Sequence, residues 1–375
     1  MSPSFPPEIL DIIVNQLRGE QAALKACCIV SKSWIHRTRI HLFASVKFHA
    51  PNPHIGQWRK TFPDPSNSPA HHTRSLSICG LSVITAEDAD AGDWIRTFHN
   101  LVHLHLECLE VDQQVSLAPF RELSPALRSL SLRAIPLEVL DLICSFPLLE
   151  DLALVFPSYG REGWNTPSIS PKLTGSLELR AYEIRPATRR LLSLPGGLHF
   201  TKVTIVCLNE DVKSTMDLVS RCSDTLESLA IQNSILGAFT SPSTSGQYLT
   251  VLVDVGMSGT PPLDLSGAAK LKDISLRFGG PSVQRITMAL QTVRSKNLRR
   301  IVIRPLYITP ESLGGETVRQ EWEDLDRLLV RFWTSHSIRP KIVYGAGKRE
   351  SALRDLAPGL LPELTRRGAV DLVKE

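Results

Sequence analysis

One apolar pattern recurs along most of the chain. The pattern is L-x-x-L-x-L, in which other apolar residues can replace Leu, and its clearest copies begin at Leu101, Leu127 and Leu149. The pattern appears again from Leu226, Leu249, Leu271 and Leu298, and weaker copies begin at Phe43, Thr73, Thr174 and Phe200. Successive copies lie about 22–30 residues apart. Alternating apolar and polar side chains are typical of a short β-strand with one buried face. The sequence therefore predicts a row of similar units, each built around one strand.

This spacing predicts the architecture of the chain. Intervals of about 20–29 residues are typical of leucine-rich repeats. Between the strands, residues 211–222, 282–295 and 321–333 carry helical patterns. A strand followed by a helix or loop stacks on the next unit and buries a continuous Leu core. We therefore predict an α/β solenoid with a curved parallel sheet and with helices or loops on its convex side. The alternative is another Leu-rich α/β domain with a chance pattern, which the near-even spacing disfavours.

The first 43 residues lack the repeat and contain three predicted helices. The helices are expected at residues 6–17, 20–28 and 33–42. Two prolines and Glu8 begin the first segment, and both residue types suit the first turn of a helix. Its apolar residues cover more than the single stripe of an amphipathic helix. The surplus apolar surface must therefore be buried elsewhere in the chain or on a partner.

Two short motifs in this segment resemble the F-box family. The family's opening Leu-Pro-x-Glu-Ile matches Phe-Pro-Pro-Glu-Ile at residues 5–9, with Phe5 replacing the usual Leu, and its closing Val-Cys/Ser-x-x-Trp matches residues 30–34. The resemblance implies a three-helix module that docks on a Skp-family adaptor of a cullin ubiquitin ligase. The residues that would supply apolar contacts are Pro6, Pro7, Ile9, Leu10, Ile13, Leu17, Val30 and Trp34. The alternative is a helical cap that buries the same residues inside the chain.

We expect three parts along the chain. The F-box occupies residues 1–43, and the degenerate leucine-rich-repeat solenoid occupies residues 44–345 with a Pro-rich insert at 51–72. Residues 346–375 form a C-terminal capping segment with a helical pattern, because the end of a solenoid must be covered. The first strand directly follows the third helix, so the helical module and the first repeats are expected to form one rigid body.

The polar positions of the predicted strands define a candidate binding surface. In a solenoid these positions line the concave face, which is the usual place of protein binding. Both charge signs occur there, so no single ligand class is indicated, although the last repeats are more basic and suit an acidic or phosphorylated partner. The charged and imidazole-bearing candidates are His103, His105, Glu107, Arg133, Asp151, Glu178, Arg180, Lys202, Arg277, Arg300 and Arg304.

The sequence contains no recognisable catalytic motif. It has no G-x-S-x-G, no Walker A loop, no G-x-G-x-x-G and no H-E-x-x-H. His103 and His105 share one strand face, and two imidazoles can bind a metal. Ordinary exposed strand positions are the favoured interpretation, so we predict no metal site, no cofactor and no enzymatic activity.

Charge and cysteine usage restrict the partners and the compartment. The formal net charge is only +4 and no long basic run exists, which disfavours nucleic acid as a partner. The seven cysteines form no C-x-x-C pair, as expected for reduced thiols in the cytoplasm or nucleus. No signal peptide and no uncharged apolar stretch of about 18 residues is evident, so no membrane segment is expected.

Together these features predict the substrate-recognition subunit of a Skp–cullin–F-box ubiquitin ligase. The F-box would bind the adaptor, the repeats would bind an unidentified protein substrate, and the chain would be a monomer within a hetero-complex. The alternative function is a leucine-rich-repeat interaction scaffold that acts independently of ubiquitin ligation. An enzyme on an α/β fold is disfavoured by the missing motifs.

Overall fold

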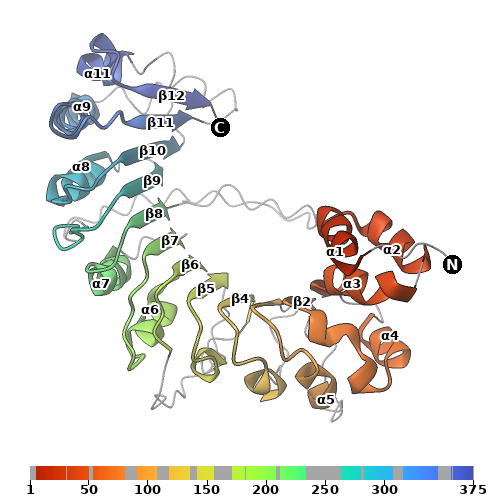
Figure 1. The fold of residues 1–375 in the computed structure, drawn as a ribbon. Coiled ribbons are helices and arrows are strands. Elements are labelled where there is room, and N and C mark those ends of the chain that lie inside the picture. Colours follow the sequence, from red (N-terminus) through yellow and green to blue (C-terminus); the bar gives the residue numbers. More distant parts are fainter. Residues whose placement is uncertain are drawn as a thin grey trace, which may run out of the picture. The chain divides into compact units, whose positions relative to one another are not determined.

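The computed structural model forms two compact units, residues 1–172 and residues 173–375. Each unit contains a parallel sheet with helices, and the helical module belongs to the first unit (Figure 1). The structure describes residues 6–30, 32–49, 54–80, 91–107, 118–135, 142–155, 171–181, 183–207, 212–233, 263–279, 283–306, 316–344, 356 and 358–374.

Three helices begin the first unit, and they confirm the three predicted helical segments. They are α1 (Pro7–Gln16), α2 (Gln21–Val30) and α3 (Lys32–Leu42). Pro7 occupies the first turn of α1, where its missing N–H group costs no hydrogen bond. Gly19 adopts a φ of 100° between α1 and α2, a conformation that other residues rarely adopt. We refer to α1, α2 and α3 as the helix cluster.

Five parallel strands follow in the first unit, paired in sequence order. They are β1 (Ser45–His49), β2 (Ser75–Cys79), β3 (His103–Glu107), β4 (Ser129–Arg133) and β5 (Asp151–Val155). The connections contain α4 (His54–Thr61), η1 (Pro65–Asn67), η2 (Pro69–His72), α5 (Ala91–Arg96) and η4 (Ala118–Glu122). The predicted Pro-rich insert at 51–72 thus contains α4, η1 and η2.

The second unit repeats the arrangement of parallel strands paired in sequence order. Its strands are β6 (Ser176–Ala181), β7 (Lys202–Cys207), β8 (Ser228–Asn233), β9 (Asp273–Gly279), β10 (Arg300–Leu306), β11 (Lys341–Tyr344) and β12 (Asp371–Lys374). Its helices are α6 (Arg185–Leu192), α7 (Val212–Cys222), α8 (Val283–Thr292), α9 (Glu316–His336) and α11 (Pro362–Arg366).

The repeated apolar positions form ladders across each sheet. In the first unit the register aligns Val46, Leu76, Leu104, Leu130 and Leu152, and all five are buried. Complete burial of one such side chain stabilises the fold by about 1.5–3 kcal/mol. The same ladder in the second unit consists of Leu177, Val203, Leu229, Ile274 and Ile301.

These ladders confirm the α/β solenoid architecture. Successive parallel strands stacked in sequence order bury a continuous apolar core between neighbouring repeats. A doubly wound sheet would place consecutive strands in a different order. Among the residues that the structure describes, no helix combines the length and the apolar character needed to cross a membrane.

The predicted repeat copy that begins at Leu249 lies outside the described residues. Leu229 of β8 pairs directly with Ile274 of β9.

The C-terminal segment contains more than the predicted capping helix. Among its described residues, α11 is short and is followed by β12, which pairs in parallel with β11. Leu360, Leu361 and Leu364 are buried there. The end of the second unit is thus covered by apolar contacts and by one more strand.

Candidate functional site

The helix cluster divides its apolar residues between a small core and a large exposed set. Leu10 and Val14 of α1 and Leu24 of α2 are buried. The buried Thr38 hydroxyl of α3 donates a hydrogen bond to the backbone oxygen of Trp34 at 2.8 Å. An ion pair between Arg37 and Asp11 joins α3 to α1. Only the ion pair of these two polar contacts joins different helices, because Thr38 and Trp34 both belong to α3.

The sequence-predicted adaptor residues therefore fall into different environments. Leu10 belongs to the internal core, whereas Val30 is 73% exposed. Ile9 is 42% exposed. The remaining described side chains lie as follows: Pro6 is exposed, and Ile13, Leu17 and Trp34 are half-buried. Pro7 begins α1.

Sequence reasoning missed three further exposed apolar residues on the helix cluster. Ile12 is 57% exposed, Ile29 is 86% exposed and Ile40 is 41% exposed. Five of the seven exposed large hydrophobic side chains among the described residues lie on this cluster. The available signal was the apolar surplus of the first helix. We refer to Ile9, Ile12, Ile29, Val30 and Ile40 as the exposed apolar set.

The alternate strand positions of the first unit form a second candidate surface. Because strand side chains point alternately to the two faces, these positions lie opposite the buried ladder. We call this side the open sheet face. One register row contains His49, Cys79, Glu107 and Arg133, and the neighbouring row contains Lys47, Ser77, His105 and Ser131.

Three predicted residues of the open sheet face contact one another. The Arg133 Nε lies 3.2 Å from Glu107 Oε1, and the His105 Nε2 lies 3.7 Å from Glu107 Oε2. The His105 Nδ1 lies 2.9 Å from the Ser131 hydroxyl oxygen. His103 and Asp151 lie in a separate row, each in register with Ser129. The structure thus brings His105, Glu107 and Arg133 together.

Cys79 adds a thiol to this group, and sequence reasoning missed it. Cys79 is half-buried and lies in register with Glu107 on the neighbouring strand. Desolvation by burial raises the pKa of the Cys79 thiol, the hydrogen bond with Ser77 and the charge of Lys47 lower it, and the hydrogen bond and proximity to the Glu107 carboxylate raise it; the net pKa shift is upward. The thiol, the imidazole and the carboxylate together offer donor atoms that can hold a metal ion.

In the second unit the predicted residues form separate small groups. Glu178 and Arg180 of β6 form an ion pair along the strand, and Lys202 lies in register with Ser176 and Ser228.

Two of the three predicted basic residues of the last repeats lie next to each other. Arg277 and Arg304 lie side by side in register on β9 and β10, whereas Arg300 lies opposite Asp273. Arg300 therefore has an acidic residue as its register neighbour on β9.

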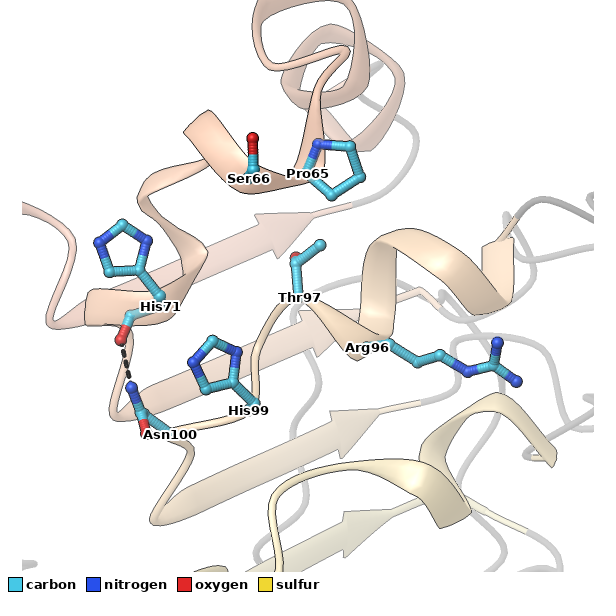
Figure 2. Close-up of a pocket in the computed structure, with 7 residues that line it drawn as sticks. All are labelled: Pro65, Ser66, His71, Arg96, Thr97, His99 and Asn100. Carbon is cyan, nitrogen blue, oxygen red and sulfur yellow. Dashed lines mark hydrogen bonds between the residues drawn. The ribbon is translucent and has the colours of Figure 1, made fainter.

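A cavity of about 630 Å³ lies on the helix-and-turn side of the first unit. Figure 2 shows His71, His99 and Asn100 on its wall, with Arg96 extending away from the imidazoles. Asn100 donates a hydrogen bond to the His71 backbone oxygen at 2.7 Å. The Arg96 Nε lies 2.7 Å from the Glu122 Oε2. His99 lines this cavity, whereas His103 and His105 belong to β3. The remaining lining residues are Pro65, Ser66 and Thr97.

Comparisons with known proteins add little to this geometry. No protein-family model matches the sequence, and no curated protein is significantly similar to it. One similar solved structure is an internalin C2 from Listeria monocytogenes, with 14% identity over 59% of this chain and 70% of that chain, at a TM-score of 0.24. Values this low add nothing to what the strand pairing shows, and the F-box resemblance is supported only by its own residues.

Proposed function

We propose that this chain is the substrate-recognition subunit of a Skp–cullin–F-box ubiquitin ligase. The helix cluster docks on a Skp-family adaptor, and the repeat sheets bind a target protein. The chain itself catalyses nothing and needs no cofactor. It raises the effective concentration of target lysines near the ubiquitin-conjugating enzyme. It acts in the cytoplasm or nucleus as a monomer within a hetero-complex.

The exposed apolar set carries this proposal. Leaving a large aliphatic side chain in water forgoes about 1.5–3 kcal/mol of burial free energy. Clusters of such side chains on a folded surface are typical of protein-interaction sites. Ile9 and Val30 belong both to this set and to the positions that match the F-box motif, and Val30 is 73% exposed. Motif position and exposure therefore coincide at Ile9 and Val30.

The repeat sheets are suited to the second binding partner. The open sheet face of the first unit carries a thiol, imidazoles and both charge signs on rigid strands. Rigid strand positions fix polar side chains more precisely than loops do, which favours specific recognition of a protein surface. Mixed charge also disfavours a general attraction to nucleic acid.

Co-purification of the full chain with a Skp-family adaptor tests the proposal. The variant combines Ile29→Asp with Val30→Asp, and both residues are exposed, so the fold should be retained. Desolvated interface anchors typically contribute about 2 kcal/mol or more, so we expect adaptor affinity to fall at least about 30-fold. Leu148→Asp is the matched control, because Leu148 is 50% exposed and lies outside the helix cluster.

The outcomes separate the two functional alternatives. Wild type and the control should bind the adaptor with equal affinity, while the double variant should bind at least about 30-fold more weakly, with unchanged thermal unfolding of all three proteins. Failure of wild type to bind where an established F-box protein binds would overturn the ligase proposal in favour of an independent interaction scaffold. Equal loss in the control would also contradict the assignment of the helix cluster as the docking surface.

A further inference from the structure

We propose that Cys79, His105 and Glu107 form a zinc-binding site on the open sheet face of the first unit. The three residues supply a thiolate sulfur, an imidazole nitrogen and a carboxylate oxygen. The fourth coordination position is open to solvent. This site differs from the metal-free surface that the sequence predicts, and it is independent of adaptor binding.

The register of two neighbouring strands creates the site. Cys79 at the end of β2 lies in register with Glu107 at the end of β3, and His105 precedes Glu107 by two residues on the same face. The candidate ligand atoms of the three residues all lie within 4.8 Å of one another. Tetrahedral zinc with bonds of about 2.0–2.3 Å requires ligand atoms roughly 3.3–3.8 Å apart. Small side-chain rotations are therefore enough to close the site.

The hydrogen bond between His105 and Ser131 leaves the Nε2 atom of His105 available to bind a metal ion. Its Nδ1 lies 2.9 Å from the Ser131 hydroxyl oxygen, and its Nε2 lies 3.7 Å from Glu107 Oε2. When Nδ1–H donates to Ser131, the lone pair of the neutral ring lies on Nε2. Metal-binding histidines are commonly oriented in this way by a partner on the other nitrogen. Ser131 is thus a positioning residue for the site.

A partner on one carboxylate oxygen also orients Glu107. The Arg133 guanidinium lies 3.2 Å from Oε1, which leaves Oε2 on the side of His105. The side chain of Arg133 is 52% exposed, so water screens its repulsion of a bound cation. Each carboxylate oxygen therefore has a separate role, one toward the arginine and one toward the ion.

The donor set favours zinc over other common divalent ions. Calcium and magnesium prefer oxygen ligands, whereas zinc accepts sulfur, nitrogen and oxygen together. The thiolate and the carboxylate together neutralise a doubly charged ion. Three protein ligands with an open fourth position are typical of zinc sites that exchange a solvent molecule or bind a further group.

The test is zinc titration of the full chain after removal of metal with a chelator. The variants are Cys79→Ser, His105→Gln, Glu107→Gln and Ser131→Ala, with His103→Ala as the matched control because His103 lies on the same strand and face. We expect one zinc ion per chain. Ser131→Ala should weaken zinc affinity about 10-fold, because loss of a residue that orients a ligand typically costs roughly 10–100-fold. Substitution of Cys79, His105 or Glu107 removes a ligand itself and should weaken zinc affinity by more than that.

Cobalt binding gives a second readout that does not depend on affinity. Wild type loaded with Co²⁺ should show a thiolate-to-metal charge-transfer band, and Cys79→Ser should lose it while retaining the wild-type thermal unfolding. Persistence of the band in Cys79→Ser would overturn the site, because another cysteine would then bind the metal. Absence of binding to wild type, or equal weakening by His103→Ala and His105→Gln, would overturn it as well.

Discussion

At the scale of single residues, His72 links the stability of the first unit to pH. Its ring centroid lies 3.8 Å from that of His71 and 5.5 Å from that of His36 on α3. Burial, followed by the positive charges of His71, His36 and Arg39, lowers the pKa of His72 from 6.5 to about 4. The unfolded chain therefore binds a proton between these pH values that the folded chain does not bind. Stability should fall as the pH falls from about 6.5 to about 4.

Thermal unfolding as a function of pH measures this linkage. His72→Gln removes the titrating ring, so the decrease of the unfolding midpoint below pH 6.5 should be shallower than in wild type. Above that pH the ring is neutral in both the folded and the unfolded chain, so both proteins should show the same slope there. An identical acid dependence in the two proteins would show that His72 does not control it.

At the scale of elements, one buried carboxylate on α9 holds the start of α11. Asp326 is 2% exposed and accepts the backbone N–H groups of Glu363 at 2.8 Å and Leu364 at 3.1 Å. Desolvation raises the pKa of Asp326, although these two hydrogen bonds act in the opposite direction. Asp326→Ala leaves both N–H groups without this acceptor. We expect a loss of about 1–3 kcal/mol in unfolding free energy per unsatisfied buried group.

Urea denaturation and hydrogen exchange of residues 362–374 measure this effect. Asp326→Asn retains one carbonyl acceptor and should lose less stability than Asp326→Ala. Asp324→Ala on the same helix is the control, because its ion pair with Arg327 is exposed and such pairs contribute about 0–1 kcal/mol. Equal losses from Asp324→Ala and Asp326→Ala would contradict the special role of the buried carboxylate.

The elements that the sequence predicted are those with a strong local signal. The alternation of apolar residues located the strands, and Pro7 and Glu8 marked the start of α1. Helix α6 was not predicted, because half of its sequence RPATRRLL is polar and only Ala187, Thr188 and Leu191 are buried, although a proline lies in its first turn as in α1. β12 escaped prediction because Leu372 and Val373 are only half-buried and make a short strand. Weakly apolar elements are specified by their neighbours rather than by their own pattern.

The candidate sites were predictable only in part, because they depend on pairing between distant residues. Alternation placed His105 and Glu107 on one face, but the register of β2 against β3 brought Cys79 beside them. A usable signal existed, since Cys79 and Glu107 each directly follow the last apolar residue of their repeat copy. In the helix cluster, the apolar pattern could not separate the buried Leu10 from the exposed Ile9.

At the scale of the whole molecule, a repeat architecture predicts that a core substitution destabilises the neighbouring repeats more than the distant ones. Each repeat of a solenoid contacts mainly its neighbours, so stability is approximately a sum of repeat and interface contributions. Leu104 of β3 is 1% exposed and lies between Leu76 and Leu130 in the ladder. Leu104→Ala should cost about 2–5 kcal/mol, because it removes buried methyl groups and leaves a cavity.

Native-state hydrogen exchange of the strand amides can locate this loss. Leu104→Ala should accelerate exchange most in β2, β3 and β4 and least in β10, β11 and β12. Ile274→Ala is the reciprocal variant, because Ile274 is 1% exposed and lies between Leu229 and Ile301. It should accelerate exchange most in β8, β9 and β10. If both variants raised exchange equally in every strand, the chain would unfold as one cooperative body, and the nearest-neighbour description would fail despite the repeated strand order.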